Sequence, residues 1–505
     1  MLKKVSLAVL LLLGLPAVLG DRNGGKTCAG CTAVLGLVEQ VAQINAGPIT
    51  DAIKQVCGLL PSPYSWTCST LISLYGKDLI KMLEDKYTPD VICTTINVCK
   101  QDTAPTCRLF PAPKSRRAND GSRMSQEEFE LHVKEAKQRF DFSHVGDLNI
   151  CDWMPGFCQV ADHKPYFDTD GDVFSSYSGL RGHDWSGKDC DDSNNAVFPG
   201  RYDKDIAQDT NCNGIFGVDP RTGVSYEDQW CEGTGAMGVA ILGDSAAAHF
   251  RIPPNYLVAQ NLSTNTLSRL VWNAENELDF PQLSWSTGHQ QTSTYGPDVD
   301  GPMNSIYMKM RQNNLCNHND YQNIGVNGAS SGSMVRQLQY LLGRDKNNSP
   351  LPQKPLLLFM AMIGNDVCNS HITSRTTPQE YHDNFLKTVT DLDPRMPKGT
   401  KVVMIGLVDG RILYDSMHDR VHPVGSTNND VTYRDFYDYL NCLEISPCAG
   451  WMNSNQTVRD GLSATAAAMR DQLPLIVEET RGKLKNIEVY YLGDVLDEAI
   501  QEFLK

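Results

Sequence analysis

Residues 239–250 read VAILGDSAAAHF, an apolar run that meets Gly-Asp-Ser and continues into three alanines. A continuous apolar run of this kind is typical of a strand buried on both faces of a sheet. Two interpretations of Gly243-Asp244-Ser245 are open. The tripeptide is an ordinary turn from strand to helix, or it raises Ser245 at the sheet edge as a nucleophile. The rest of the chain decides between them.

Three further apolar runs predict buried strands, namely PLLLFMAMI at 355–363, KVVMIGL at 401–407 and IEVYYL at 487–492. Stretches with helical character over 376–391 and 458–480 separate some of these runs. The alternation predicts an α/β domain with a three-layer, mostly parallel sheet. In such sheets, catalytic groups gather at the carboxyl ends of the strands.

Three of the predicted strand ends carry distinctive residues. The first ends in Gly-Asp-Ser at 243–245, the turn in NIGVNGAS reaches Gly328, and the run 355–363 ends in Gly364-Asn365-Asp366. These blocks, in this order, resemble the first three blocks of the GDSL or SGNH hydrolases, a family of serine esterases and lipases. The resemblance favours the second interpretation, in which the turn presents the serine as a nucleophile.

The resemblance also implies a role for each residue. Ser245 attacks an ester carbonyl, and charge then develops on the carbonyl oxygen. Backbone N–H groups of Ser245 and Gly328 and the side-chain amide of Asn365 hold that oxyanion. The alanines at 246–248 are expected to let the next helix pack closely beneath the serine.

The serine requires a base, which the family takes from an Asp-x-x-His block near the C-terminus, after the last strand. The pair here that is followed by proline is Asp419 and His422, ahead of the last predicted strand. Either His422 is the base and Asp419 orients it, or the chain is truncated and the true pair is missing. We favour truncation, because His422 does not occupy the family's usual position.

The N-terminus and the cysteines indicate secretion. Lys3 and Lys4 precede an apolar run that ends in small residues, which predicts a signal peptide over 1–20. The 16 cysteines are then expected mainly in disulfides. Three sequons predict glycosylation, at Asn261, Asn347 and Asn455. The net charge of −15 argues against a nucleic-acid partner.

Residues 24–103 contain six cysteines among apolar residues at helical spacing, with prolines that divide the segment into about four helices. The spacing resembles the saposin-B type domain, a family of lipid-interacting four-helix modules. The resemblance implies three disulfides: Cys28–Cys99, Cys31–Cys93 and Cys57–Cys68. Spacing alone leaves other connectivities open, and a disulfide-stapled bundle without a lipid role is the alternative.

Residues 104–150 turn polar and read as a linker. The dibasic pair Arg116-Arg117 offers a processing site, although such pairs are often simply solvated. Cys107 lies in this linker, where a disulfide would tie it to the large domain.

The segment 151–229 is rich in aspartate, and its carboxylates would repel one another without cations between them. Calcium takes six to eight oxygen ligands from flexible loops. The spacing does not fit an EF-hand, and it resembles the aspartate-rich calcium repeats of the thrombospondin type-3 kind. We therefore expect structural Ca²⁺, held by Asp168, Asp170, Asp172, Asp189, Asp191, Asp192, Asp203, Asp205, Asp209, Asn211 and Asn213.

The order of these segments, with a hydrolase domain over 230–505, resembles the acyloxyacyl hydrolases, a family of secreted enzymes that remove secondary acyl chains from the lipid A of lipopolysaccharide. GNDVCN at 364–369, HDRVHPVG at 418–425 and NCLEISPCAGW at 441–451 contribute to the resemblance. It implies an α+β multidomain, secreted or lysosomal ester hydrolase whose partners are lipid A and phospholipid acyl chains, and membrane or micelle contact through the saposin-type domain. It also implies a two-chain, disulfide-linked form after cleavage. A lysosomal phospholipase and an inactive lipid-binding protein are the alternatives.

Overall fold

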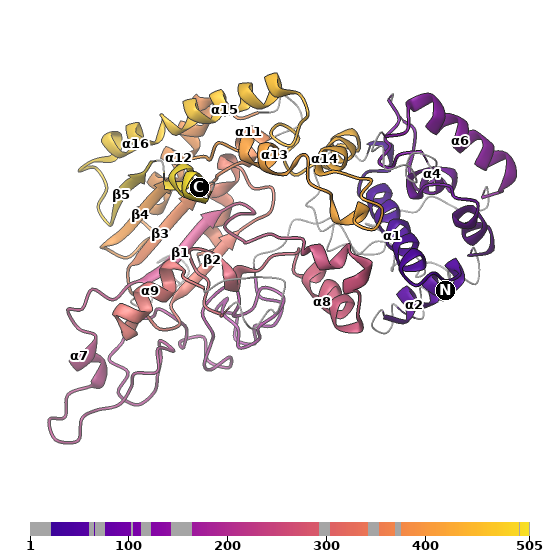
Figure 1. Ribbon diagram of the computed structural model, residues 1–505. Coiled ribbons are helices and arrows are strands. Elements are labelled where there is room, and N and C mark those ends of the chain that lie inside the picture. The colour runs from indigo at the N-terminus through magenta and orange to yellow at the C-terminus, as the bar shows by residue number, and fades with distance from the viewer. Residues whose placement is uncertain are drawn as a thin grey trace. The chain divides into compact units, whose positions relative to one another are not determined.

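The computed structural model describes residues 22–59, 65, 76–102, 105–112, 123–142, 164–291, 303–341, 353–368, 375–493 and 495–503 (Figure 1). The expected signal peptide lies outside these residues. Contacts divide the chain into two compact units. Unit 1 comprises Met1–Val160, Ile252–Leu278 and Gly410–Asp460, and unit 2 comprises Ala161–Arg251, Asp279–Asp409 and Gly461–Lys505.

Unit 1 is helical. Its elements are α1 (Gly25–Ile44), α2 (Ile49–Leu59), a helical stretch over 76–84, α4 (Pro89–Thr95), α6 (Gln126–Arg139), α8 (Thr264–Glu275), α13 (Arg411–Met417) and α14 (Tyr433–Cys442). The expected division at residue 230 differs from this partition, because Ile252–Leu278 and Gly410–Asp460 pack with the saposin-like helices.

Helix α1 explains that packing. It is buried on nearly all sides, and Figure 1 shows it among α4, α8 and α14. Its Thr32 hydroxyl lies 2.9 Å from the hydroxyl of Tyr439 in α14, and the Gln40 amide donates to the carbonyl of Val424. Among the described residues, α1 alone has the length and apolar character to cross a membrane, and 83% of that window is buried inside the structure. This burial is typical of a core helix.

Disulfides staple unit 1. Cys28 is bonded to Cys99 and Cys31 to Cys93, the two pairings that the saposin resemblance implies. Cys57 is also in a disulfide, while its expected partner Cys68 lies outside the described residues. Cys107 is bonded to Cys442 at the end of α14. This disulfide joins the linker to the segment after residue 230, as expected from the sequence.

Unit 2 contains a five-stranded sheet whose described strand pairs are all parallel, in the order β2-β1-β3-β4-β5. The strands are β1 (Gly238–Gly243), β2 (Tyr321–Gly325), β3 (Leu356–Ala361), β4 (Thr400–Ile405) and β5 (Ile487–Leu492). The other helices that lie wholly or mostly in unit 2 include α7 (Tyr226–Trp230), α9 (Ile306–Asn313), α11 (Asn365–Cys368), α12 (Pro378–Leu392), α15 (Gln456–Arg470), α16 (Leu473–Thr480) and α17 (Val495–Phe503).

Both faces of the central strands are buried. Tyr307 of α9 packs with Val239, Ile241 and Phe359 on one face. Residues that alternate with these, such as Leu358 and Met404, are fully buried on the other face, where α12 and α16 border the sheet (Figure 1). This layering confirms the predicted α/β class.

Three local expectations are corrected. Strand β5 is a sheet edge with alternating exposure rather than a strand buried on both faces, and Tyr490 and Leu492 are exposed. The predicted helix over 458–480 is two helices, α15 and α16, with a break around Asp471. Ser245 is followed by a turn and not by a regular helix. The turn ends at Phe250, whose N–H donates to the Ser245 carbonyl.

Candidate active site

Sheet register brings the three predicted blocks to one edge. Gly243, the last residue of β1, pairs with Gly325 at the end of β2 on one side and with Ala361 at the end of β3 on the other. Ser245 and Asn365 follow β1 and β3 within one short turn. Carboxyl ends of neighbouring parallel strands open at the same sheet edge, so the side chains that follow them share it.

Asp244, the residue before the serine, ties β1 to β3. Its carboxylate accepts hydrogen bonds from the backbone N–H groups of Ala246 (3.0 Å), Ile363 (2.9 Å) and Gly364 (3.2 Å). Burial raises the pKa of Asp244 to about 6, while these three donors act in the opposite direction. The carboxylate is therefore largely ionised at neutral pH and holds the first block against the third.

Asn365 ties the third block to the second. Its side-chain Nδ2 donates to the carbonyl of Ala329 over 2.9 Å. The preceding residue, Gly328, has a φ of 76°, a left-handed conformation that glycine adopts without strain. An amide carries two N–H donors, so the bond to Ala329 leaves Asn365 a second donor for a ligand.

The donors expected to form an oxyanion hole are not consumed by the fold. Within the described ranges, no acceptor takes the backbone N–H of Ser245 or of Gly328, and no side chain bonds to the Ser245 hydroxyl. Ser245 is half-buried and Gly328 is exposed. Preorganised donors of this kind stabilise a developing oxyanion.

Close packing holds the serine turn on the strands. A Cβ at Gly325 would lie 2.6 Å from the backbone nitrogen of Ala248, and one at Gly243 would collide with Ala247. The turn itself is closed by a hydrogen bond from the Phe250 N–H to the Ser245 carbonyl (2.8 Å). Small residues at 246–248 thus permit a tight approach, although to a turn rather than to the expected helix.

A second buried carboxylate was not singled out from the sequence. Asp366 accepts hydrogen bonds from the N–H (2.8 Å) and hydroxyl (2.6 Å) of Ser331, and Asn384 of α12 donates to the same hydroxyl. Burial raises the pKa of Asp366. The aspartate of Gly-Asn-Asp was the available signal, because a carboxylate that is buried a few residues after a strand requires hydrogen-bond donors.

The Asp419–His422 pair is not formed. Asp419 contacts Nε2 of His418 (3.0 Å) and the guanidinium of Arg434 (2.6 Å). His422 is buried, stacks on Phe436 and accepts at Nδ1 from the Val424 N–H. Burial lowers its pKa to about 3. Both residues belong to unit 1, and the expectation that Asp419 orients His422 is corrected, because the Asp419 carboxylate contacts Arg434 and His418 instead.

Acidic loops at 164–214 bring together five of the predicted calcium ligands. Carboxylate oxygens lie within 4.8 Å of one another in two groups: Asp168, Asp170 and Asp192, and Asp170, Asp172 and Asp189. One oxygen each of Asp170, Asp172 and Asp189 is buried without a hydrogen-bond partner in the described structure. Burial raises the pKa of Asp172 to about 8 and that of Asp189 to about 6. Buried, unpartnered carboxylate oxygens of this kind suit a hard cation.

The other predicted ligands contact protein groups instead. Some of these contacts are local: Arg201 pairs with Asp203, Thr210 donates to Asp205, and the N–H groups of Asn213 and Gly214 donate to Asp209. Others join more distant parts of the segment: Gln208 donates to Asp191, and the amides of Asn211 and Asn213 donate to Glu227. A disulfide, Cys190–Cys212, links the two halves of the segment. Asp205 nevertheless keeps one buried oxygen without a partner among the described residues.

Two of the three sequons can be located. Asn261 and Asn455 are exposed, and Asn347 lies outside the described residues. Exposure is the condition that glycosylation requires.

Comparison with known proteins gives the family. A saposin-like domain model matches residues 27–153, and a GDSL-like lipase/acylhydrolase model matches 239–473. Relatives named acyloxyacyl hydrolase match from Homo sapiens (37% identity; 96% of this chain and 83% of the relative), Oryctolagus cuniculus (37%; 96% and 84%) and Mus musculus (36%; 95% and 83%). A saposin-like segment, a GDSL domain and this similarity along almost the whole chain lead to one conclusion: the chain belongs to the acyloxyacyl hydrolase family and is a lipid-directed ester hydrolase.

Proposed function

We propose that this protein is a secreted lipase that hydrolyses secondary, acyloxyacyl fatty-acid esters of lipopolysaccharide lipid A through a serine acyl-enzyme. The hydrogen-bonded convergence of the three blocks around Ser245 is the observation that carries the proposal. The name shared by the relatives supports the choice of ester, and the saposin-like segment supports a substrate with long acyl chains.

The proposed reaction begins with attack of the Ser245 hydroxyl on the ester carbonyl. The backbone N–H groups of Ser245 and Gly328 and the second amide N–H of Asn365 hold the oxyanion. The alcohol leaves, the acyl group stays on Ser245, and water then releases the fatty acid. A base must take the hydroxyl proton in the first step, and that role is not assigned to any residue within the described ranges.

The saposin-like helices are proposed to receive acyl chains. Each buried methylene contributes about 0.8 kcal/mol, so a single chain supplies a large favourable term. That term offsets the repulsion between a protein of net charge −15 and a phosphorylated lipid. Phospholipids offer the same acyl chains and are proposed as additional partners, at a membrane or micelle surface.

The disulfides support an oxidising, secreted or lysosomal location. The proposed cleavage after Arg116-Arg117 falls outside the described residues. Cys107 precedes that pair and is bonded to Cys442. A cut there would therefore leave two chains joined covalently.

Purified protein is expected to release secondary fatty acids from lipopolysaccharide at least about ten times faster than primary ones. The physical reason is that the two ester types differ in the alcohol that must leave and in their depth below the headgroup. Mass spectrometry of the released acids and of the residual lipid A measures the release of secondary and of primary fatty acids. Preferential release from phosphatidylcholine vesicles would instead support the phospholipase alternative, and binding without release would support an inactive lipid carrier.

We further propose that the two acidic groups hold Ca²⁺, and we expect chelation to destabilise unit 2. A site saturated at about 100 times its dissociation constant contributes about 2.7 kcal/mol, so loss of two such sites would lower the melting temperature by several degrees. Asp172→Asn is expected to remove most of the calcium-dependent part of the shift. The matched variant Asp203→Asn, whose carboxylate pairs with Arg201, is expected to keep it.

The pH dependence of this effect has a definite sign. The folded-state pKa of Asp172, about 8, lies above its ordinary value of 3.8. Without calcium, this group's contribution to stability is therefore present below about pH 4 and is lost as pH rises through 8. Calcium must then stabilise the protein more at pH 8 than at pH 5, as scanning calorimetry with and without chelator can measure. An equal calcium effect at both pH values would contradict the assignment.

A further inference from the structure

His183, Asp184 and His289 form a further cluster in unit 2, distinct from the two groups of aspartates and from the Ser245 edge. His183 and Asp184 close a turn in the aspartate-rich segment, where the His183 N–H donates to the Tyr177 carbonyl (2.7 Å). His289 follows a short helical turn, and its N–H donates to the Gln282 carbonyl (2.9 Å). The sequence separates the two segments widely, and only the fold brings them together.

Strand β2 provides the surface on which they meet. The Asn323 N–H donates to the carbonyl of Trp185, and the Tyr321 hydroxyl donates to the carbonyl of His183, both over 2.7 Å. The His289 ring stacks on the buried ring of Tyr321 at 4.7 Å with an interplanar angle of 21°. Both histidines are thus positioned by the same tyrosine.

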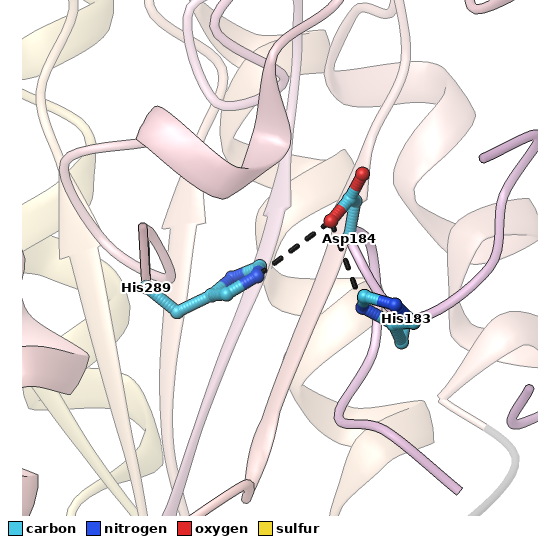
Figure 2. A group of neighbouring side chains, drawn as sticks. All are labelled: His183, Asp184 and His289. Atoms are coloured by element: carbon cyan, nitrogen blue, oxygen red, sulfur yellow. Dashed lines mark ion pairs between the residues drawn. The ribbon is translucent and has the colours of Figure 1, made fainter. Parts of the chain in front are cut away.

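The two imidazole rings lie close to the same carboxylate oxygen, Oδ1 of Asp184. Figure 2 shows both rings turned toward Asp184, with Nδ1 of His183 and Nε2 of His289 each 3.6 Å from its Oδ1. At 3.6 Å, neither pair is a good hydrogen bond. Donors about 2.0–2.2 Å from a tetrahedral metal lie about 3.3–3.6 Å apart, so the spacing matches two ligands of one ion.

The donor set is that of a transition metal. Two imidazole nitrogens and one carboxylate oxygen, all within 4.8 Å of one another, match three-ligand zinc sites that keep a fourth position open. The nitrogen donors distinguish the cluster from the all-oxygen acidic groups, which suit calcium. The side chains are 21%, 6% and 15% exposed, so the cluster is largely shielded while still reachable. The Gln290 amide donates to the same Asp184 oxygen (3.1 Å) and orients it.

We propose that His183, Asp184 and His289 bind one divalent transition-metal ion of the zinc type, which fastens the aspartate-rich segment to the β2 edge of the sheet. The cluster packs on Tyr321, the first residue of β2, whereas the Ser245 edge lies at the carboxyl ends of the strands. Four residues of strand separate the two ends by about 13 Å, so the ion does not touch the reacting ester.

The ion would nonetheless support the active edge indirectly. The segment that contains His289 also contains Ser284 and Thr287. The Ser284 hydroxyl donates to the Ala247 carbonyl (2.7 Å) in the turn after Ser245. Asn323 of β2 donates both to that carbonyl (2.8 Å) and to Thr287 (3.0 Å). Fixing His289 therefore restrains a loop that contacts the turn after Ser245.

The test uses the full-length protein, stripped of metal, refilled with Ca²⁺ and titrated with Zn²⁺ or Co²⁺ in excess Ca²⁺. One equivalent of Zn²⁺ is expected to bind per chain, and Co²⁺ is expected to give the visible absorption of a low-coordinate site with nitrogen ligands. His289→Ala and Asp184→Asn should each reduce the stoichiometry from one to near zero. The matched variant His132→Ala, on α6 and outside the cluster, should retain it.

Folding of the variants is checked by their unchanged Ca²⁺ content and circular dichroism. If both cluster variants fail to fold, the wild-type titration still decides, because the proposal requires saturable Zn²⁺ binding that excess Ca²⁺ does not displace. Absence of that binding in the wild-type chain would overturn the proposal. Wild-type Co²⁺ absorption in a folded His289→Ala protein would also overturn it.

Discussion

Ser245→Ala is expected to reduce fatty-acid release by at least about 10⁴-fold while leaving the fold intact. Removing the nucleophile of a serine hydrolase removes the acyl-enzyme route, and only binding and oxyanion stabilisation remain. The hydroxyl has no hydrogen-bond partner among the described residues, so its loss costs little stability. Initial rates on lipopolysaccharide measure the first effect, and thermal unfolding measures the second.

The matched control is Ser454→Ala, which removes an exposed hydroxyl from unit 1. It should keep wild-type rates. Wild-type release by a folded Ser245→Ala protein would refute the proposed nucleophile, and with it the esterase assignment of this edge. Binding of lipid A by that variant should persist, because lipid binding is proposed to rest on the saposin-like helices.

Asn365→Ala is expected to lower kcat by about 10²–10³-fold with little change in KM. The hydrogen bond from its amide to the carbonyl oxygen of the ester is proposed to strengthen as negative charge develops on that oxygen. Its removal therefore destabilises the transition state more than the bound substrate. The same variant breaks the bond to the Ala329 carbonyl and is expected to cost about 1 kcal/mol of stability. Steady-state kinetics and denaturant unfolding separate the two effects.

Asn384→Ala provides the comparison for Asn365. Asn384 donates to the Ser331 hydroxyl, which in turn donates to Asp366, the residue after Asn365. Asn384 itself lies in α12 and is not one of the proposed oxyanion donors. A similar stability cost with a much smaller fall in kcat is expected. If both variants reduced kcat equally, Asn365 would be a positioning residue rather than an oxyanion donor.

The sequence predicted the elements of the site better than their surroundings. The runs that became β1, β3 and β4 are long, apolar and locally unambiguous, and the residues proposed for the active site follow β1 and β3 closely. Strand β5 was assigned correctly in position and wrongly in burial, because a strand's neighbours cannot be read from its own residues. The serine turn looked helical because alanine favours helices, whereas tight contacts at Gly243 and Gly325 favour a turn.

Partners distant in sequence were the least predictable. Asp419 and His422 have the spacing of the family's Asp-x-x-His block. In the structure, however, the Asp419 carboxylate contacts Arg434 and His418. Of the aspartates expected to bind calcium, spacing alone could not separate those that converge from those that bond to protein groups. Both outcomes depend on which loops pack together, and that is decided by many weak contacts.

The amino-acid sequence by itself determined four of the five described strands, the disulfide-rich helical segment, the acidic loops and the three blocks around Ser245, because hydrophobic period, cysteine spacing and short motifs are local properties of the chain. Only the tertiary structure decided the strand order β2-β1-β3, the burial of α1 against α14, and the meeting of His183 with His289. These arrangements join residues far apart in the chain, and their stability comes from burial and hydrogen bonds that exist only once the fold has closed.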